Sequence, residues 1–325
     1  MEGYLAQGLE LESHSSPLSL PGGQGLTSSQ AEEDVALDEE EVVSILSASA
    51  PAPQLDQAPD QTPHQNGQWE LPVGWLPEGN LFSALLADPR WLHFSASYDY
   101  YINDEDLRPG GAISLGEVFS LYRLHGPFAG QSEVGLQAGV FAIFDLDADS
   151  HDLINADYWV ALHGCYRREQ FSAMARVYHQ SSHLGDAFLL RGGVDRVDLS
   201  LEGTDLRLSY ELIHGFRLYG GGGFIFNQKD TDIKPWSTQV GIEFRSPWAF
   251  GKGFIRPVGG VDVKNHQEHG WRADFSVRAG IQFDSVQVLG RNLQLLLQYY
   301  DGYSPDGQFY KIKIQYLGAG IHFYF

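Results

Sequence analysis

Strict alternation of side-chain character is the feature that most limits how this chain can fold. It is clearest over residues 171–181. One parity carries apolar or small side chains and the other carries polar or longer ones: Phe171, Ala173, Ala175 and Val177 against Ser172, Met174, Arg176 and Tyr178. A period of two is that of a β-strand, whereas a helix would repeat every 3.6 residues. The apolar parity ends in His179 and Ser181, which therefore share its face.

The same alternation returns from Trp91 to the end of the chain, in segments of about ten residues. The members of one apolar face in four such segments are Phe94, Ala96, Tyr98 and Tyr100; Val134, Leu136, Ala138 and Val140; Leu293, Leu295, Leu297 and Tyr299; Leu317, Ala319, Ile321, Phe323 and Phe325. A soluble β-sandwich would alternate too. Long strands, aromatic residues at strand ends and small residues such as Gly220–Gly223 favour an all-β, transmembrane antiparallel β-barrel.

The connections between these segments alternate between long and short. The long, mostly acidic ones are 103–111, 146–152, 182–193, 228–234, 264–270 and 301–310, and shorter turns such as 167–170 and 213–215 lie between them. Outer-membrane barrels combine long outer loops with short periplasmic turns in this way. Six long loops predict about twelve strands. A parity change across Glu202–Asp205 is interpreted as a bulge within one long strand, with a turn between two strands as the alternative.

Composition separates the N-terminal part from the rest. Residues 1–90 hold fifteen acidic residues and one basic residue, Arg90, in a chain of net charge −21. Residues 1–68 are rich in Pro, Gln, Ser, Ala and Asp, which predicts a disordered acidic tail. Residues 69–90, with Leu81–Leu86 at helical spacing, predict a periplasmic linker or plug-like segment with a short helix. The barrel is expected to span 91–325.

Several classes of protein are disfavoured by these data. The acidic charge argues against nucleic-acid binding, which requires a basic surface. No stretch reaches the roughly 18 apolar residues of a membrane-spanning helix. A location in the bacterial outer membrane requires export, although no basic residue precedes Arg90 and no signal peptide is visible. The lone Cys165 forms no intrachain disulfide and is expected to be a packed residue.

A histidine, a hydroxyl and a carboxylate are predicted to meet at the outer ends of two neighbouring strands. His179 and Ser181 lie beside the third long loop, and Asp195 shares the parity of Leu199 and Leu201 on the following strand. Polar groups on a lipid face cost free energy unless they lie near the interface, so their presence calls for a reason. Hydrolysis of lipid esters would supply one, whereas plain interfacial polar residues are the alternative.

In the predicted triad, Ser181 attacks an ester carbonyl, His179 takes its proton and Asp195 orients the imidazolium. Asp186 is the alternative acid. Groups of the Ser182–Gly185 turn would stabilise the oxyanion.

The run His179-Gln-Ser181, followed by Asp195-Arg196, resembles the active-site stretch of outer-membrane phospholipase A, which has His-Gln-Ser and an Asn-Arg pair on the next strand. It is also similar to the lipid A 3-O-deacylase barrels, which have His-x-Ser-Asn and a downstream Glu. Here Ser182 stands where both families have Asn, and the acid lies two residues further on. The match covers about twenty residues. The resemblance implies a hydrolase of phospholipid or lipid A esters in the outer leaflet.

A wider resemblance runs from about Phe82 to Phe325. Its motifs are Tyr-His-Gln-Ser-Ser-His-Leu-Gly-Asp186, Leu-Ile-Asn-Ala-Asp157, Lys-Pro-Trp236, Phe-Arg-Ser-Pro-Trp248 and His-Phe-Tyr-Phe325. They are similar to a bacterial family of exported proteins known only as a domain of unknown function, which implies an outer-membrane location and no activity. The terminal Phe325 resembles the signal that the barrel-insertion machinery recognises. That machinery and outer-membrane lipids are the expected partners, and a small-solute channel or structural barrel is the alternative function.

An acidic run in the second long loop is the only metal candidate. Asp145, Asp147 and Asp149 resemble the start of a calcium loop, but an EF-hand needs glycine where Ser150 stands and glutamate where Ala156 stands. An EF-hand is therefore excluded. No cofactor is expected, and Ca²⁺ is left open as an accessory ion.

Overall fold

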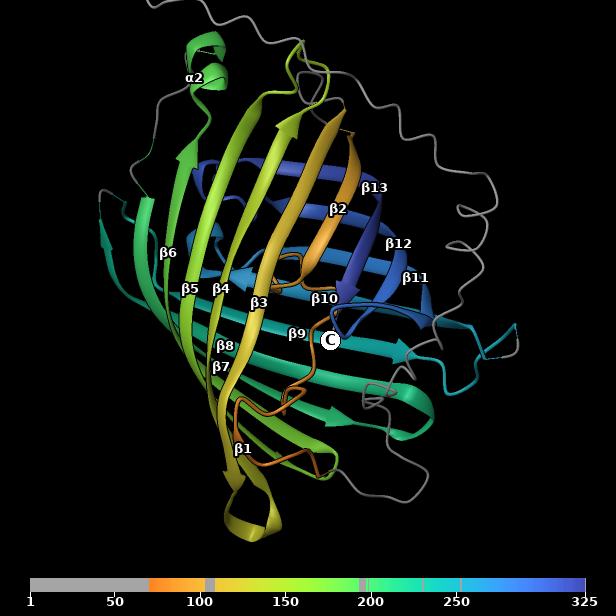
Figure 1. The fold of residues 1–325 in the computed structure, drawn as a ribbon. Coiled ribbons are helices and arrows are strands. Elements are labelled where there is room, and N and C mark those ends of the chain that lie inside the picture. Colours follow the sequence, from red (N-terminus) through yellow and green to blue (C-terminus); the bar gives the residue numbers. More distant parts are fainter. Residues whose placement is uncertain are drawn as a thin grey trace, which may run out of the picture. The chain divides into compact units, whose positions relative to one another are not determined.

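The computed structural model describes residues 70–102, 109–192, 197, 199–229, 231–251 and 253–324. Twelve long strands close into a barrel, and a two-residue strand, β1 (Gly74–Trp75), adds to β3 (Figure 1). The barrel strands are β2 (Phe94–Tyr101), β3 (Gly110–His125), β4 (Gln131–Asp145), β5 (Leu153–Arg168), β6 (Phe171–Leu184), β7 (Leu199–Glu211), β8 (Phe216–Lys229), β9 (Trp236–Arg245), β10 (Ile255–His266), β11 (Ala273–Val288), β12 (Arg291–Tyr303) and β13 (Lys313–Tyr324). The predicted strand number is confirmed.

Each strand pairs antiparallel with its neighbours in sequence, and the last strand closes the ring. β13 pairs with β2 from Tyr316 opposite Tyr101 to Phe323 opposite Phe94. Closure satisfies the backbone N–H and C=O groups of both end strands, which lipid could not do. None of the helices in the described part of the chain is long and apolar enough to cross a membrane.

The two faces of the wall differ in the sense expected for a barrel in lipid. Exterior side chains such as Leu297, Leu136 and Tyr98 are 69%, 43% and 51% exposed. Interior positions instead hold buried polar and charged side chains, among them Arg123, Glu133, Gln137, Asn155, Asp157, His163, Arg176 and Asp205. A soluble β-sandwich would bury its apolar face, so this distribution identifies the alternation as that of a membrane barrel.

The connections also alternate as expected. Those at one end are 102–109, 146–152, 185–198, 230–235, 267–272 and 304–312, and they include α2 (Asp186–Gly192), η3 (Gln267–His269) and η4 (Gly307–Phe309). Those at the other end include η1 (Pro127–Ala129), η2 (Ile213–Gly215) and the tight turn Leu289-Gly290. Both residues of that turn have positive φ, 52° and 76°, as a two-residue hairpin turn requires.

β7 is one continuous strand, as predicted, but the bulge expected within it at Glu202–Asp205 is not there. The register shift lies between Glu202 and Gly203, and the extra residue is on β8, because Glu202 pairs with Asn227 and Gly203 with Ile225. The parity of β7 itself does not change. Leu199 and Leu201 point inward and are 2% and 6% exposed. The expectation that they share the lipid face is therefore wrong.

The plug segment, residues 70–93, begins at the wall, where β1 pairs with β3 and Trp75 is 80% exposed, and its part from Asn80 to His93 lies buried inside the barrel (Figure 1). Arg123 of β3 donates hydrogen bonds to the carbonyls of Pro72, Glu78 and Gly79. Further contacts come from around the wall: Glu133 and Arg167 bind the backbone of Leu81, Arg217 binds Ser83 and Ala84, and Glu243 and Arg278 bind Leu86. The interior polar side chains thus satisfy the backbone of an inserted segment.

The short helix expected over 81–86 is wrong, since this stretch consists of bends and coil. Its backbone groups bind side chains of the barrel wall, which removes the need for helical hydrogen bonds. The predicted disordered tail, residues 1–68, and the terminal Phe325 lie outside the described residues.

Candidate functional site

A hydrogen-bonded chain of polar side chains lies on the exterior of the barrel. The Nδ1–H of His179 on β6 donates to Oε1 of Glu202 on β7, at 2.9 Å. Nδ2 of Asn227 on β8 donates to the other oxygen, Oε2, at 2.7 Å. Because a carboxylate only accepts hydrogen bonds, this arrangement leaves the Nε2 atom of a neutral His179 unprotonated and able to act as a base.

Ser181 lies on the same exterior row as His179, two residues closer to the long connections. Its cross-strand neighbours are Tyr158 on β5 and Ser200 on β7. Among the described residues no hydrogen bond joins the Ser181 hydroxyl to His179. Catalytic hydrogen bonds often shorten only when substrate is bound, so this geometry is compatible with a nucleophile and its base. The row therefore contains a hydroxyl, an imidazole and a carboxylate.

Among the described residues, the acid that contacts His179 is Glu202. Asp195 lies outside the described residues and stays a prediction, although Leu199 and Leu201, whose parity it was expected to share, face the lumen. Asp186 begins α2 and is exposed, and no hydrogen bond to His179 is found for it in the described structure. Glu202 holds the imidazole instead. Leu208 and Leu206 face the exterior, and every second residue counted back from them along β7 shares that face. This count identifies Glu202 as an exterior residue from the sequence alone.

The interior face of the same strand end is occupied by a separate network. Ser182 is 1% exposed, and its hydroxyl donates to Asn155 Oδ1 at 3.0 Å. Gln308, in the connection between β12 and β13, donates to the Ser182 carbonyl at 2.8 Å. The Gly185 N–H donates to the Ile154 carbonyl. The expected oxyanion role is therefore wrong for the Ser182 side chain, which faces inward, and the Gly185 N–H is already engaged.

The acidic loop that suggested calcium binding contains its own cation. Arg191 of α2 bridges Asp145 at 3.1 Å and Asp152 at 2.9 Å. Oδ1 of Asp145 also accepts the N–H groups of Asp147 and Ala148, and the Asp147 and Asp149 side chains are exposed. The guanidinium thus neutralises much of the charge that a divalent ion would use.

A second group of possible ligands lies inside the barrel, where atoms of Glu133, His163 and Cys165 lie within 4.8 Å of one another. The carboxylate oxygens of Glu133 already accept several hydrogen bonds. Its carboxylate pairs with Arg123 at 2.7 Å and also accepts from Ser120 and from the backbone of Leu81. A carboxylate saturated in this way makes a poor metal ligand. This cluster is best understood as part of the plug anchorage.

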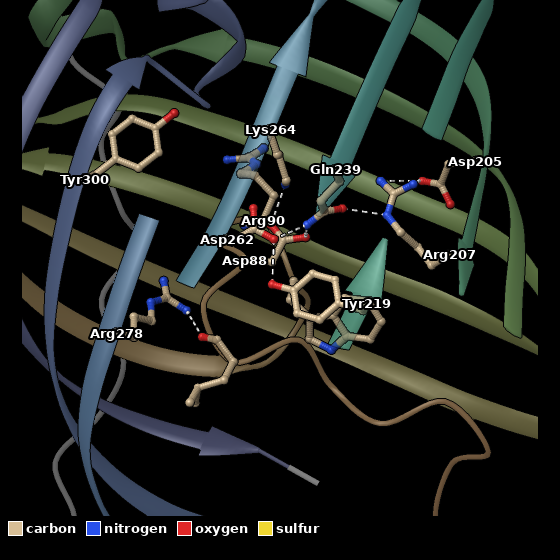
Figure 2. Close-up of polar contacts among 12 residues, drawn as sticks. Asp88, Arg90, Asp205, Arg207, Tyr219, Gln239, Asp262, Lys264, Arg278 and Tyr300 are labelled. Atoms are coloured by element: carbon tan, nitrogen blue, oxygen red, sulfur yellow. Dashed lines mark hydrogen bonds and ion pairs between the residues drawn. The ribbon is translucent and has the colours of Figure 1, made fainter. Parts of the chain in front are cut away.

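The lumen also contains a network of buried charges around Asp88 of the plug segment (Figure 2). Lys264 pairs with Asp88 at 2.5 Å, and Gln239 donates to both Asp88 and Asp262. Tyr219 donates to Asp262 at 2.6 Å. Burial opposes ionisation of Asp88, but Lys264 and the hydrogen bonds outweigh it and hold its pKa below the ordinary value. The plug is thus held by charge as well as by backbone contacts.

A profile of DUF1207, described as a protein of unknown function, matches residues 21–325. The chain belongs to the DUF1207 family. This confirms the wider resemblance noted from the sequence. No curated protein sequence matches the chain.

Solved structures with a similar fold include two phospholipases. Outer membrane phospholipase A from Escherichia coli is 13% identical with a TM-score of 0.51, over 71% of this chain and 90% of that one. The outer membrane phospholipase of Salmonella typhi, a dimer with bound calcium, is 14% identical with a TM-score of 0.51, over 76% and 94%. At such identities the likeness shows a shared outer-membrane barrel fold alone.

Proposed function

We propose that this barrel is an outer-membrane serine hydrolase that cleaves fatty-acyl esters of phospholipid or lipid A. The observation that carries the proposal is the Asn227–Glu202–His179 chain of hydrogen bonds on the exterior, with Ser181 on the same row. Two of these four residues, His179 and Ser181, belong to the run that resembles the active-site stretch of known lipid hydrolases. An ordinary lipid-facing wall has no need of such a chain, because each polar group there costs free energy.

In the proposed reaction, Ser181 Oγ attacks the ester carbonyl while Nε2 of His179 takes its proton. Glu202, held by Asn227, keeps the Nδ1–H of His179 in place and stabilises the imidazolium. His179 then returns the proton to the leaving alcohol, and water releases the acyl group by the reverse sequence. Donors near Ser181 that could stabilise the oxyanion are Tyr158 and Ser200.

The surroundings suit a substrate that is already in the membrane. Val177 and Val160, which flank the row, are 54% and 49% exposed on the exterior. The row also lies toward the barrel end with the long connections, the outer end in this proposal. Acyl chains would lie along the apolar exterior while the ester reaches Ser181. No metal takes part in these steps, and an accessory role for Ca²⁺ is tested by adding EDTA to the assay.

The test is release of fatty acid by the purified chain from vesicles of phospholipid or of lipid A. Ser181→Ala and His179→Ala should each reduce the rate by at least about 10³-fold. The matched controls are Ser132→Ala, on the exterior parity of β4 at the opposite end, and His125→Ala, which is exposed at the end of β3. A sulfonyl fluoride should label Ser181 in the wild type. Equal activity in all variants, or no release by the wild type, would refute the proposal.

A small-solute channel is the alternative, and the plug bears on it directly. Side chains of β3, β4, β5, β8, β9, β10 and β11 contact the plug segment and hold its buried part inside the lumen. A barrel filled in this way conducts ions only if the plug moves. Steady conductance of the wild type in planar bilayers, together with no hydrolysis, would favour the channel.

A further inference from the structure

The barrel contains an open cavity of about 200 Å³ between the plug segment and the long connections. Asp88 of the plug segment and Lys264 of β10 line it, together with residues of three long connections and the adjoining strand ends: residues 233–238, His266, Glu268, His269, Tyr303, Ser304, Pro305, Gly307 and Tyr310. For comparison, an engineered cavity of about 150 Å³ holds benzene. The space is thus large enough for a small molecule, and it lies on the opposite face of β6 from the exterior row.

Charges in the cavity wall balance and are largely paired. The lining includes five acidic and five basic residues: Asp88, Asp205, Asp262, Glu268 and Asp274 against Arg90, Arg176, Arg207, Lys234 and Lys264. Arg176 and Asp205 form two hydrogen bonds, at 2.9 and 2.6 Å. Lys264 pairs with Asp88, and Arg90 pairs with Asp157 at 2.6 Å. An ion entering this cavity would have to break one of these buried pairs, which is costly.

Aromatic side chains supply the second character of the wall. Five of them line it: Trp159, Tyr178, Tyr300, Tyr303 and Tyr310. Trp159 and Tyr178 stack with ring centroids 4.2 Å apart, and Tyr303 stacks on His269 at 3.7 Å. Figure 2 shows Tyr300 set apart from the paired charges of the network. Rigid, flat surfaces of this kind pack against the C–H faces of a ligand, while neighbouring polar groups bind its hydroxyls.

We propose that this cavity is a binding site for a neutral, polyhydroxylated solute of monosaccharide size. The balance of charges, most of them paired, disfavours an anion or a cation relative to a neutral ligand. The mixture of aromatic surfaces with hydroxyl and amide groups, such as those of Ser276 and Gln180, matches a ligand that is apolar on its ring face and polar at its rim. The site is independent of the proposed hydrolase, since its side chains point into the lumen.

The experiment is isothermal titration calorimetry of the full chain at pH 7, in a polyoxyethylene detergent that carries no sugar headgroup. The probes are glucose and galactose, with glucuronate and glucosamine as charged counterparts. We expect a neutral hexose to bind with a Kd in the millimolar range and at least about tenfold more tightly than either charged sugar.

Two variants locate the binding. Ser276, on β11, is 3% exposed and lines the cavity, so Ser276→Phe should fill it and abolish binding. Trp159→Ala removes one aromatic surface and should weaken binding by about tenfold. Tyr98→Ala, on the exterior, is the control and should bind as the wild type does.

No binding of either hexose up to about 100 mM, equal binding of the charged sugars, or unchanged binding by Ser276→Phe would each overturn the proposal. If Ser276→Phe does not fold, Trp159→Ala and the comparison of neutral with charged sugars still decide the question.

Discussion

Removing the Arg123 side chain should release the plug segment. Arg123 is fully buried and binds Glu133 through Nε and Nη2, at 2.9 and 2.7 Å, besides three plug carbonyls. Arg123→Ala leaves the Glu133 carboxylate buried without its partner and the carbonyls without a donor. Breaking a buried pair in this way costs about 3–5 kcal/mol. At 1.36 kcal/mol per factor of ten, the population with an undocked plug should rise by about 10²- to 10⁴-fold.

The single cysteine of the chain reports this change without further engineering. Cys165 is 4% exposed and packs in a cluster with the plug residues Leu81, Phe82 and Leu85. Its thiol should react with a maleimide only when the plug leaves, at a rate proportional to the undocked population. Arg256→Ala is the control, because Arg256 pairs with Asp284 away from the plug. A labelling rate for Arg123→Ala within about threefold of the wild type would refute the reasoning.

Three further results are expected. Glu202→Gln should lower fatty-acid release by about 10²- to 10⁴-fold, whereas Asp186→Asn should not, and the reverse would favour Asp186, the alternative acid predicted from the sequence. Wild type should conduct little in planar bilayers and Arg123→Ala should conduct more; equal traces would contradict the plug. Burial, with a contribution from Asp157, raises the pKa of Asp306 to about 6. Stability should therefore fall as pH rises from 3.8 to about 6, and Asp306→Asn should unfold at higher denaturant than wild type at pH 8 but not at pH 4.

Alternation was enough to predict the barrel because a lipid-facing wall allows few exceptions to it on the exterior. Inside the barrel the rule is weaker. Leu199 and Leu201 are apolar and yet face the lumen, where they line the cavity, so the sequence pattern assigned them to the wrong face. Because Glu202 lies on the opposite parity from Leu199 and Leu201, that assignment kept Glu202 out of the predicted site. The periodicity of a strand determines which residues share a face, but it does not determine whether an apolar face points to lipid or to an internal cavity.

The plug was harder still to predict. The spacing of Leu81–Leu86 suits a helix, and a free segment would satisfy its backbone that way. In the barrel, Arg167 and Arg217 bind those carbonyls, and Glu133 and Glu243 bind the N–H groups. Such partners are between about 50 and 160 residues away along the chain, beyond the reach of any local pattern.

The distribution of plug contacts has a consequence for biogenesis. The segment precedes every barrel strand in the sequence, but its last anchors, Lys264 and Arg278, belong to strands made near the end of synthesis. A partly assembled sheet can bind the first half of the plug segment through Arg123 and Glu133, but it cannot yet bind the second half. Complete docking of the plug segment therefore requires that nearly all strands have assembled. Closure of the barrel wall and occlusion of its lumen are coupled in this way.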